Sequence, residues 1–252
     1  MKLRSIGDWK KMGKEDPYYG VLSDEKFRIN RITEDDLKEF FSSGEVFVQE
    51  TKDRLKRFFD SSLAESTVLD FGCGAGRLLF PFAKITTKTV TGLDVSADII
   101  AMARRRMADL GIENLELKTF DGVSLPELPR FDFINSYIVF QHIETSLGFS
   151  LLQQLFEKLK VGGIMQVHLT YGHALPYLTY WNFQLRSKVR FYNYLYSLLK
   201  NRKAGPELVM QMNRYPPEKL FNLFSSHSNN VHVELTNHGG HLGAIYLLRK
   251  DR

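Results

Sequence analysis

The stretch VLDFGCGAGR, residues 68–77, runs from an apolar segment directly into three glycines at alternate positions. Glycine adopts the left-handed backbone conformations that a tight turn needs, and it leaves no Cβ between the backbone and a ligand. The first residues of a helix after such a turn offer free N–H groups and a partial positive charge. We therefore predict a buried strand, a tight turn and a helix that begins near Gly76, with a ligand bound on the turn.

The same order of strand and helix recurs along the chain. Apolar or alternating runs predict strands at 67–71, 89–95, 114–120, 130–140 and 163–171, and two closing strands at 231–237 and 243–250. Helical patterns lie between most of them, so we predict an α/β fold with a doubly wound, mostly parallel sheet and helices on both faces. Pro81 falls about five residues into the first of these helices and is expected to kink it.

Three regions differ in composition. Residues 1–65 are polar and helical, and we interpret them as an N-terminal helical extension that forms a lid. Residues 66–171 and 215–252 are expected to form the α/β core. Residues 172–214 mix aromatic with basic side chains, and we predict a helical cap insertion there. The aromatic residues suggest a large or apolar small-molecule substrate, and the cations suggest an acidic group on it or a peripheral membrane contact. An ordinary amphipathic helix pair or a homodimer face is the alternative.

The totals limit the class of protein. Of the 252 residues, 43% are hydrophobic and 25% are charged, as in ordinary water-soluble globular domains. A net charge of +5 permits an acidic partner without requiring one. Cys73 is the one cysteine, which excludes a disulfide framework or a cluster held by several thiolates within the chain. No apolar run approaches the ~20 residues of a membrane span, and the first residues lack the apolar segment of a secretory signal, so we expect a cytoplasmic protein.

The residues around the glycines distinguish between cofactors. A dinucleotide site has the pattern G-x-G-x-x-G, whereas here the third glycine, Gly76, comes one residue early. Asp70 precedes the turn, where a carboxylate would repel a pyrophosphate and attract an ammonium group. Asp94 ends the second strand, 18 residues after Gly76, and can accept hydrogen bonds from both hydroxyls of a ribose. Asp121 ends the third strand, where its carboxylate could accept a hydrogen bond from an adenine amino group. A nicotinamide dinucleotide is therefore disfavoured.

Five segments in this order resemble the motifs of class I S-adenosylmethionine-dependent methyltransferases. They are VLDFGCGAGR (68–77), GLDVS (92–96), TFDGVSL (119–125), FDFINSYIVFQHI (131–143) and LKVGGIMQVHL (159–169). The resemblance covers residues 66–171 well and 216–250 loosely. It implies a seven-stranded Rossmann-like sheet with the last strand antiparallel, S-adenosyl-L-methionine as the cofactor and S-adenosyl-L-homocysteine as its product.

The resemblance also implies which residues bind the cofactor. Asp70 would meet its methionine moiety, Asp94 would bind the ribose, and Asp121 would lie near the adenine. In such enzymes N-terminal aromatic residues commonly fold over the cofactor as a lid, a role that Tyr18 and Tyr19 could take here together with Trp9; their alternative role is to anchor the N-terminal helices to the sheet. The predicted cofactor-binding residues are Asp70, Gly72, Cys73, Gly74, Gly76, Asp94, Val95, Asp121, Gly122, Tyr137 and Tyr19.

Several methyl acceptors are disfavoured by residues that the chain lacks. Methylation of cytosine at carbon five needs a cysteine nucleophile, and Cys73 lies inside the glycine turn. Methylation of planar exocyclic nitrogens uses N/D-P-P-Y/F after the fourth strand, where this chain has NSYI at 135–138. A hydroxyl, carboxylate, amine or activated carbon of a small-molecule or lipid-like acceptor remains, and we expect no stable nucleic acid partner. An RNA methyltransferase and a non-catalytic cofactor-binding partner subunit are the alternatives.

Two histidines at the carboxyl ends of strands are candidate catalytic bases. His142 follows the fourth strand and His173 the fifth, where the acceptor is expected to lie. His142 could instead cap the next helix or pack against adenine. Candidate acceptor-binding residues are Tyr18, Tyr171 and Trp181. The last part of the chain holds possible metal ligands whose spacing does not enforce a site, so we expect no metal: His232, Glu234, His238 and His241.

Overall fold

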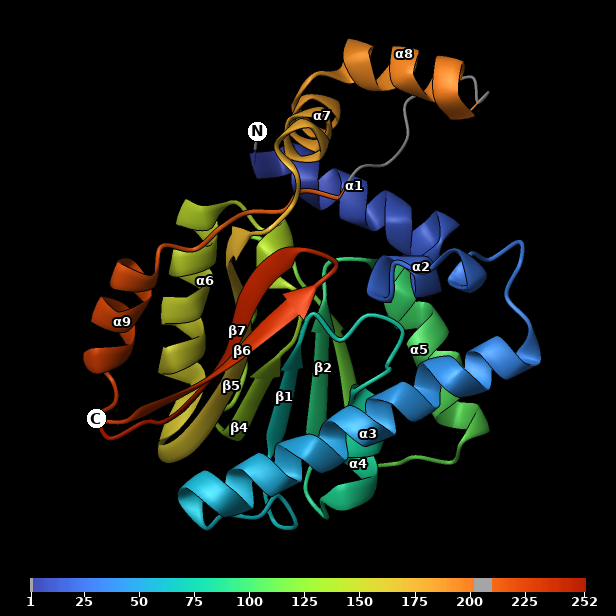
Figure 1. Cartoon of the computed structure of the whole chain (residues 1–252). Helices are drawn as coiled ribbons and strands as arrows, with labels where there is room; N and C mark the ends of the chain where they lie inside the picture. Colours follow the sequence, from blue (N-terminus) through green and yellow to red (C-terminus); the bar gives the residue numbers. More distant parts are fainter. Residues whose placement is uncertain (1, 202–209) are drawn as a thin grey trace.

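The strands of the chain pair in a seven-stranded sheet. The computed structural model describes residues 2–201 and 210–252, and its strands are β1 (Val68–Phe71), β2 (Val90–Asp94), β3 (Leu115–Thr119), β4 (Phe131–Ser136), β5 (Leu159–His173), β6 (Val231–His238) and β7 (His241–Arg249). Their order is β3-β2-β1-β4-β5-β7-β6 (Figure 1). β7 is antiparallel to both neighbours, and the other pairs are parallel. The predicted doubly wound, mostly parallel sheet is confirmed.

Helices cover both faces of the sheet. They are α1 (Lys2–Glu15), α2 (Pro17–Val21), α3 (Glu34–Phe59), α4 (Leu79–Ile85), α5 (Ala97–Asp109), α6 (Thr145–Lys158), α7 (Tyr177–Lys188), α8 (Arg190–Asn201) and α9 (Pro217–Ser225), with short 3-10 helices η1 (Glu25–Phe27) and η2 (Phe140–His142). Because side chains alternate along a strand, Val68 packs on the face covered by α3, α4 and α5. Leu69 and Phe71 pack on the opposite face, under α6 and α9.

The helix after the glycine turn begins later than the sequence predicts. α4 begins at Leu79 instead of near Gly76, because the preceding residues form an irregular turn in which Gly76 has a φ of +89°. Pro81 is therefore the third residue of α4, within the first turn, where a backbone N–H has no helical partner. Pro81 therefore removes no helical hydrogen bond, and α4 continues past it to Ile85, so the physical reason for the predicted kink does not apply. Similarly, α6 ends at Lys158, and β5 begins directly after it, before Gly162 and Gly163.

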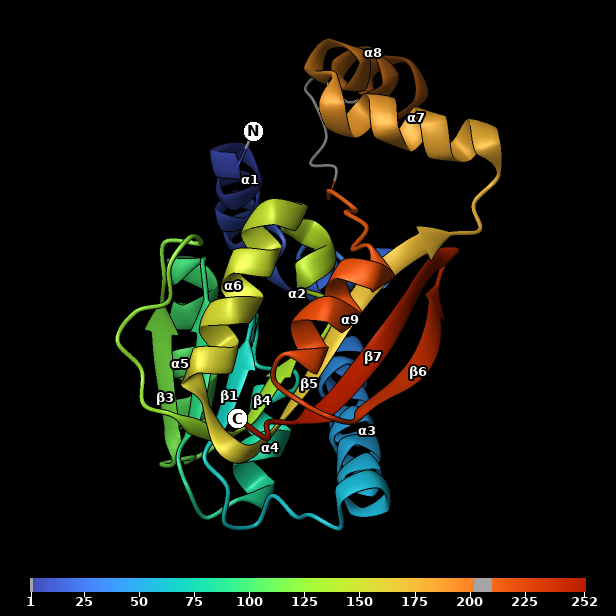
Figure 2. The same ribbon diagram turned by 90° about the vertical axis from the view of Figure 1, so that its left-hand side faces the viewer.

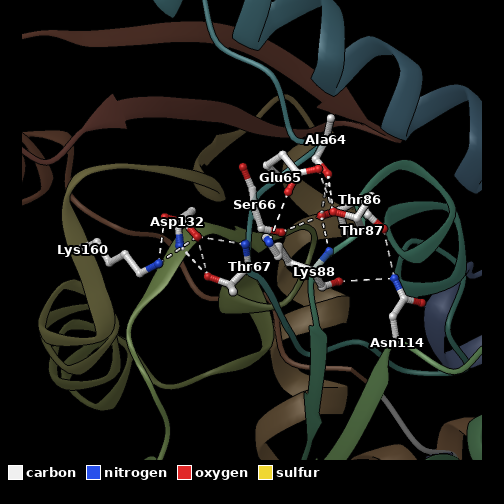
Figure 3. Close-up of polar contacts among 10 residues, drawn as sticks. All are labelled: Ala64, Glu65, Ser66, Thr67, Thr86, Thr87, Lys88, Asn114, Asp132 and Lys160. Carbon is white, nitrogen blue, oxygen red and sulfur yellow. Dashed lines mark hydrogen bonds and ion pairs between the residues drawn. The ribbon is translucent and has the colours of Figure 1, made fainter.

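Polar contacts join the amino ends of the strands, at the edge of the sheet away from the glycine turn (Figure 3). Asp132 accepts hydrogen bonds from the backbone N–H and the hydroxyl of Thr67 at 2.9 and 2.6 Å, and it pairs with Lys160 at 2.9 Å. The amide of Asn114 donates to the carbonyl of Lys88 at 3.3 Å. These contacts join β1 to β4 and β5, and β2 to β3, at the amino edge, while the carboxyl ends lead into the loops of the candidate site.

Two helical segments lie at the carboxyl edge of the sheet. α1 and α2 cross this edge, and α1 packs against α5 (Figure 1). α7 and α8 form a helical hairpin that projects beyond the same edge, and their main contacts are with each other (Figures 1 and 2). Residues 202–209 of the predicted cap insertion lie outside the described residues. In the part of the chain that the structure describes, no helix is both long and apolar enough to span a bilayer.

Candidate functional site

A cleft lies where the carboxyl ends of β1, β2 and β4 meet the N-terminal helices. It encloses about 960 Å³ of space between the atoms, part of it open to solvent. Its floor includes Gly72 and Gly74 of the glycine turn, and α1 closes it with Trp9 and Met12. In an open parallel sheet this edge is the usual place for a ligand. The cleft is therefore the candidate site.

The glycine turn brings bare backbone to the cleft. Gly72 and Gly74 have φ values of +76° and +51°, which side chains other than glycine rarely adopt. A Cβ on Gly72 would lie 2.4 Å from Val139 Cγ2, and one on Gly74 would lie 2.7 Å from Val21 Cγ2. The turn is held from below, because the N–H of Gly72 donates to the carbonyl of Leu93 at 2.7 Å. Both conformation and close approach thus require glycine here.

Three further predicted residues lie at or near this turn. Cys73 is buried, and burial raises the pKa of its thiol, so it remains a neutral thiol. Gly76 has Phe80 packed against the position that a Cβ would take. Val95 lines the cleft beside Asp94. Of these residues, Val95 faces the cleft and the other two shape the turn around it.

Asp94 joins the end of β2 to the glycine turn. Its Oδ2 accepts a hydrogen bond from the backbone N–H of Gly74 at 3.0 Å, and its Oδ1 accepts one from the N–H of Ser96 at 2.9 Å. Burial raises the pKa of the carboxyl, while these two bonds favour its ionised form. Each carboxylate oxygen can accept more than one hydrogen bond. The side chain lines the cleft and is positioned to accept hydrogen bonds from hydroxyl groups of a ligand.

Asp70 lies beneath the turn rather than on the wall of the cleft. It is 2% exposed, and its Oδ1 accepts a hydrogen bond from Asn135 Nδ2 at 2.8 Å. Gln166 donates in turn to Asn135 and to Thr51 of α3, each at 3.0 Å. Burial is the main cause that raises the pKa of Asp70, to about 6, against the opposing effects of Asn135 and Arg77. The carboxyl is a buried acid that a nearby cation would ionise fully.

The loop after β3 contributes backbone and an aromatic ring. Asp121 caps its own loop, since its Oδ1 accepts hydrogen bonds from the N–H groups of Val123 and Ser124 at 2.7 and 2.8 Å. These bonds lower the pKa of Asp121. Gly122 and Phe120 line the cleft. Phe120 was not among the residues predicted from the sequence, although its position directly before Asp121 indicates that it lies near the cofactor site.

The loop after β4 carries Tyr137 and a strained residue. Tyr137 lines the cleft, and its hydroxyl lies 3.3 Å from His238 Nε2 of the β6–β7 turn. Its ring packs on Phe47 with 4.2 Å between the centroids. Ile138 also lines the cleft and has a φ of +59°, which is unusual for a β-branched side chain. Strained backbone conformations of this kind cluster at active sites and ligand-binding positions.

His142 faces the cleft from η2. Its Nδ1 lies 2.8 Å from the carbonyl of Gln211 and therefore carries the proton. Its Nε2 lies 3.2 Å from the amide nitrogen of Gln141, and its ring lies 4.7 Å from that of Trp9. Burial lowers the pKa of His142 to about 4. At neutral pH the ring is therefore uncharged, and its Nε2 is a hydrogen-bond acceptor.

Nine predicted residues do not line this cleft: Asp70, Cys73, Gly76 and Asp121, described above beside it, and five that lie elsewhere. Tyr18 packs edge-on against Phe40, with 5.2 Å between the ring centroids, and Tyr19 lies 3.9 Å from the guanidinium of Arg28. The ring of His173 stacks on Tyr180 at the base of the hairpin, 3.8 Å away. The other two residues outside the cleft are Tyr171, at the end of β5, and Trp181, on α7. Their proposed roles stay predictions.

The possible metal ligands have other partners. His232 stacks on Phe58 with 4.3 Å between the centroids, and Glu234 pairs with Arg54 at 2.6 Å. His238 contacts Tyr137, as described above. Within residues 2–201 and 210–252, no three histidine, cysteine or acidic side chains come together as a metal-binding group.

Comparisons with known proteins agree with this geometry. Residues 68–163 match the family model described as a methyltransferase domain. A ubiquinone biosynthesis O-methyltransferase of Bradyrhizobium sp. (strain ORS 278) is 34% identical over 100 residues, which are 40% of this chain and 38% of that protein. A probable fatty acid methyltransferase of Pseudomonas putida is 29% identical over 102 residues, which are 40% of this chain and 26% of that protein.

The likeness to solved structures extends over nearly the whole chain. The crystal structure of magnesium protoporphyrin IX methyltransferase from Synechocystis PCC 6803 with bound S-adenosylmethionine has a TM-score of 0.62. It is 14% identical, and the match covers 98% of this chain and 97% of that one. In sequence, by contrast, the matches span less than half the length of these curated relatives. The structural likeness shows the fold, and the sequence matches identify the domain within residues 68–163.

Proposed function

The chain carries a class I S-adenosylmethionine-dependent methyltransferase domain, and from this premise we propose that the protein transfers a methyl group to a small, partly apolar acceptor. The observation that carries the proposal is the position of Asp94 beside the glycine turn on the wall of a cleft. A carboxylate next to bare backbone suits a ligand that combines a ribose with an amino acid chain.

The residues on the cleft fit this cofactor. Gly72 and Gly74 leave room where a Cβ would collide with neighbouring side chains, and Asp94 offers oxygens to the ribose hydroxyls. Phe120 and Val139 offer apolar contact to an adenine ring. When bound, the cofactor supplies an electrophilic methyl group on a sulfonium. The chain has to hold that group, align the acceptor and exclude water, and α1 excludes water by closing the cleft.

The acceptor class follows from the lining of the cleft and from the relatives. Val139, Ile143 and Leu147 give this wall apolar surface beside His142 and Glu144, so a hydrophobic part of the acceptor can bury its surface against them. By their printed names, two relatives act on fatty acids and in ubiquinone biosynthesis. We therefore favour an amphiphilic acceptor with a hydroxyl or carboxylate group.

His142 is proposed to orient the acceptor group where that group is a hydroxyl, which can donate to it. A neutral imidazole whose Nδ1 donates to Gln211 has its Nε2 lone pair available to a hydroxyl, once the Gln141 amide gives way. With a pKa of about 4, His142 would hold an abstracted proton only weakly. Positioning is thus its main role. His142→Ala is expected to reduce turnover much more than cofactor affinity, and equal loss of both would contradict this role.

The alternatives find less support. Binding of RNA would need a basic stripe beside the cleft. In the predicted cap, however, the guanidinium of Arg186 stacks on Tyr196 at 4.1 Å and donates to Asn193. These contacts within the hairpin make Arg186 less suited to an outer basic stripe. A non-catalytic partner subunit would have an occluded pocket, whereas this cleft has room beside the glycine turn.

A transfer assay tests the proposal. The protein is incubated with methyl-labelled S-adenosylmethionine and, separately, a long-chain fatty acid, a prenylated phenol, a porphyrin carboxylic acid, total RNA or a protein extract. We expect label in one of the small amphiphiles, and none with Asp94→Asn. Label that enters only RNA or protein would contradict the acceptor class. Failure of labelling in every fraction, despite tight binding of S-adenosylhomocysteine, would contradict catalysis.

A further inference from the structure

On the hairpin of α7 and α8, the two buried side chains among those that the structure describes are polar, and most of the large apolar ones are exposed. On α8, Asn193 and Ser197 are 4% and 0% exposed, whereas Phe191 and Leu199 are 76% and 73% exposed. Asn193 and Ser197 are four residues apart and so lie on one face of the helix. A helix of a water-soluble domain has the opposite arrangement. The inner face is polar in its contacts as well, since Arg186 of α7 donates to Asn193 at 3.4 Å.

The exposed apolar side chains concentrate on this hairpin. Large apolar side chains are exposed at seventeen positions among the described residues, and nine of them lie within 178–199. On α7 the most exposed is Leu178 at 81%, followed by Trp181 at 47%. Isolated exposed apolar residues are common, but a contiguous group marks an interaction surface. This group is Leu178, Trp181, Leu185, Val189, Phe191, Tyr194, Leu195, Leu198 and Leu199.

The charge of the segment indicates what covers this surface. Between Glu157 and Glu207 the sequence has no acidic residue, and residues 177–201 contain Lys188, Arg190 and Lys200 besides Arg186, which contacts Tyr196 and Asn193 within the hairpin. A second copy of the hairpin would therefore bring like charges together. An anionic bilayer surface complements them, and aromatic residues such as Trp181 and Tyr194 suit the boundary between headgroups and acyl chains. We propose that the hairpin docks on a membrane surface that contains anionic lipids, with its apolar side in the acyl boundary.

The attachment of the hairpin places this contact beside the cleft. The chain enters the hairpin from β5, where the N–H of Ala174 donates to the carbonyl of Gly240 at 2.8 Å. It returns through residues 211–215, where the N–H of Asn213 donates to the carbonyl of Gln141 at 2.6 Å. His142 donates to Gln211 in the same segment. Docking therefore brings the edge of the sheet that carries the cleft toward the bilayer, as the projection of the hairpin in Figure 2 suggests.

Vesicle sedimentation tests this inference and needs neither cofactor nor acceptor. The full chain is mixed with vesicles of phosphatidylcholine alone, or with vesicles of phosphatidylcholine that contain about 30% of the anionic lipid phosphatidylglycerol. We expect the protein to bind the anionic vesicles, and to bind the neutral ones at least about tenfold more weakly. Salt at roughly 0.5 M should weaken binding to the anionic vesicles, because exposed charges are screened at that ionic strength. Phe191→Asp with Leu199→Asp should abolish binding.

Matched variants keep the result interpretable. Val46→Asp with Val161→Asp adds the same charge at positions that are 60% and 65% exposed outside the hairpin, and it should bind vesicles as the unaltered protein does. Circular dichroism checks that both double variants fold. Equal binding by the Phe191/Leu199 variant, or no binding by the unaltered protein, would overturn the inference. So would a dimer in light scattering that this variant dissociates, because a second copy would then be what covers the surface.

Discussion

The carboxylate of Asp94 and the backbone N–H of Gly74 are joined by a hydrogen bond of 3.0 Å on the floor of the cleft. The bond connects the end of β2 to the turn after β1, which are separated by a helix in sequence. It orients the carboxylate of Asp94 and fixes the backbone of the turn at the same time. The two elements that would hold a cofactor are therefore one structural unit.

Gly74→Ala should disrupt this unit in a way that a control glycine does not. Both Gly74 and Gly111 have positive φ, so alanine costs about 1 kcal/mol of strain at either position. Only at Gly74 would the new Cβ meet a neighbour, Val21, and face the cleft. We expect Gly111→Ala to bind S-adenosylhomocysteine normally and Gly74→Ala to lose at least about tenfold in affinity. Isothermal titration of both variants checks this, and equal affinities would argue against a ligand on the turn.

Asp70→Asn should stabilise the ligand-free protein near neutral pH. An unfolded aspartate ionises near 3.8, but folded Asp70 keeps its proton up to about 6. Between these values the folded state binds more protons, so its stability falls as pH rises through this window and stays lower above it. The difference corresponds to about 3 kcal/mol.

Thermal unfolding between pH 4 and 8 measures this effect. The midpoint of Asp70→Asn should exceed that of the unaltered protein at pH 7.5, and the difference should shrink as the pH falls from 6 to 4. Asn135 can still donate to the new amide oxygen, so its contact with residue 70 is retained. A lower unfolding midpoint for the variant at every pH would show that the buried charge of Asp70 does not destabilise the folded protein.

His142→Gln should make the protein less sensitive to acid. Folded His142 resists protonation down to about 4, whereas the unfolded chain takes up the proton near 6.5. The contribution of His142 to stability is therefore complete above 6.5 and is lost as the pH falls toward 4, by about 3 kcal/mol. Glutamine removes that dependence. Melting curves from pH 7 to 4.5 should show a smaller fall in Tm for the variant, and parallel curves would refute the assignment.

Trp9 should report ligand binding, because it lines the cleft against His142. The chain has two tryptophans, so Trp181→Phe leaves Trp9 as the one emitter. Its fluorescence should change when S-adenosylhomocysteine is added. Trp9→Phe leaves Trp181, which does not line the cleft, and its emission should stay constant. The reverse pattern would place the ligand under the hairpin instead.

Much of the fold could be read from the sequence because its signals are local. Alternating apolar runs and the glycine turn predicted the strands. Thr33 is another local signal, since its hydroxyl accepts a hydrogen bond from the N–H of Asp36 and so caps α3. The start of α4 could not be predicted, since the irregular turn packs against α3, where Gly44 leaves room for the backbone carbonyl of Arg77. Local sequence cannot encode a boundary that a distant contact decides.

The candidate site was only partly readable for a similar reason. Asp94 and the glycines follow strands directly, so topology alone brings them to the cleft. The partners of His142 could not be foreseen, because Gln211 comes from a segment 69 residues later. Nor could the inside-out pattern of α8 be recognised before Asn193 and Ser197 were seen to be buried.

Binding of S-adenosylhomocysteine to the unaltered protein, to Asp94→Asn and to Asp98→Asn tests the central claim most directly. Asp98 is an exposed acid four residues further along, so its variant controls for the change in charge. At about 100 times its dissociation constant the ligand adds about 2.7 kcal/mol of stability, which raises the Tm by a few degrees. The account predicts this rise for the unaltered protein and Asp98→Asn, and its loss for Asp94→Asn. An equal rise in all three, or a rise with NAD alone, would contradict it.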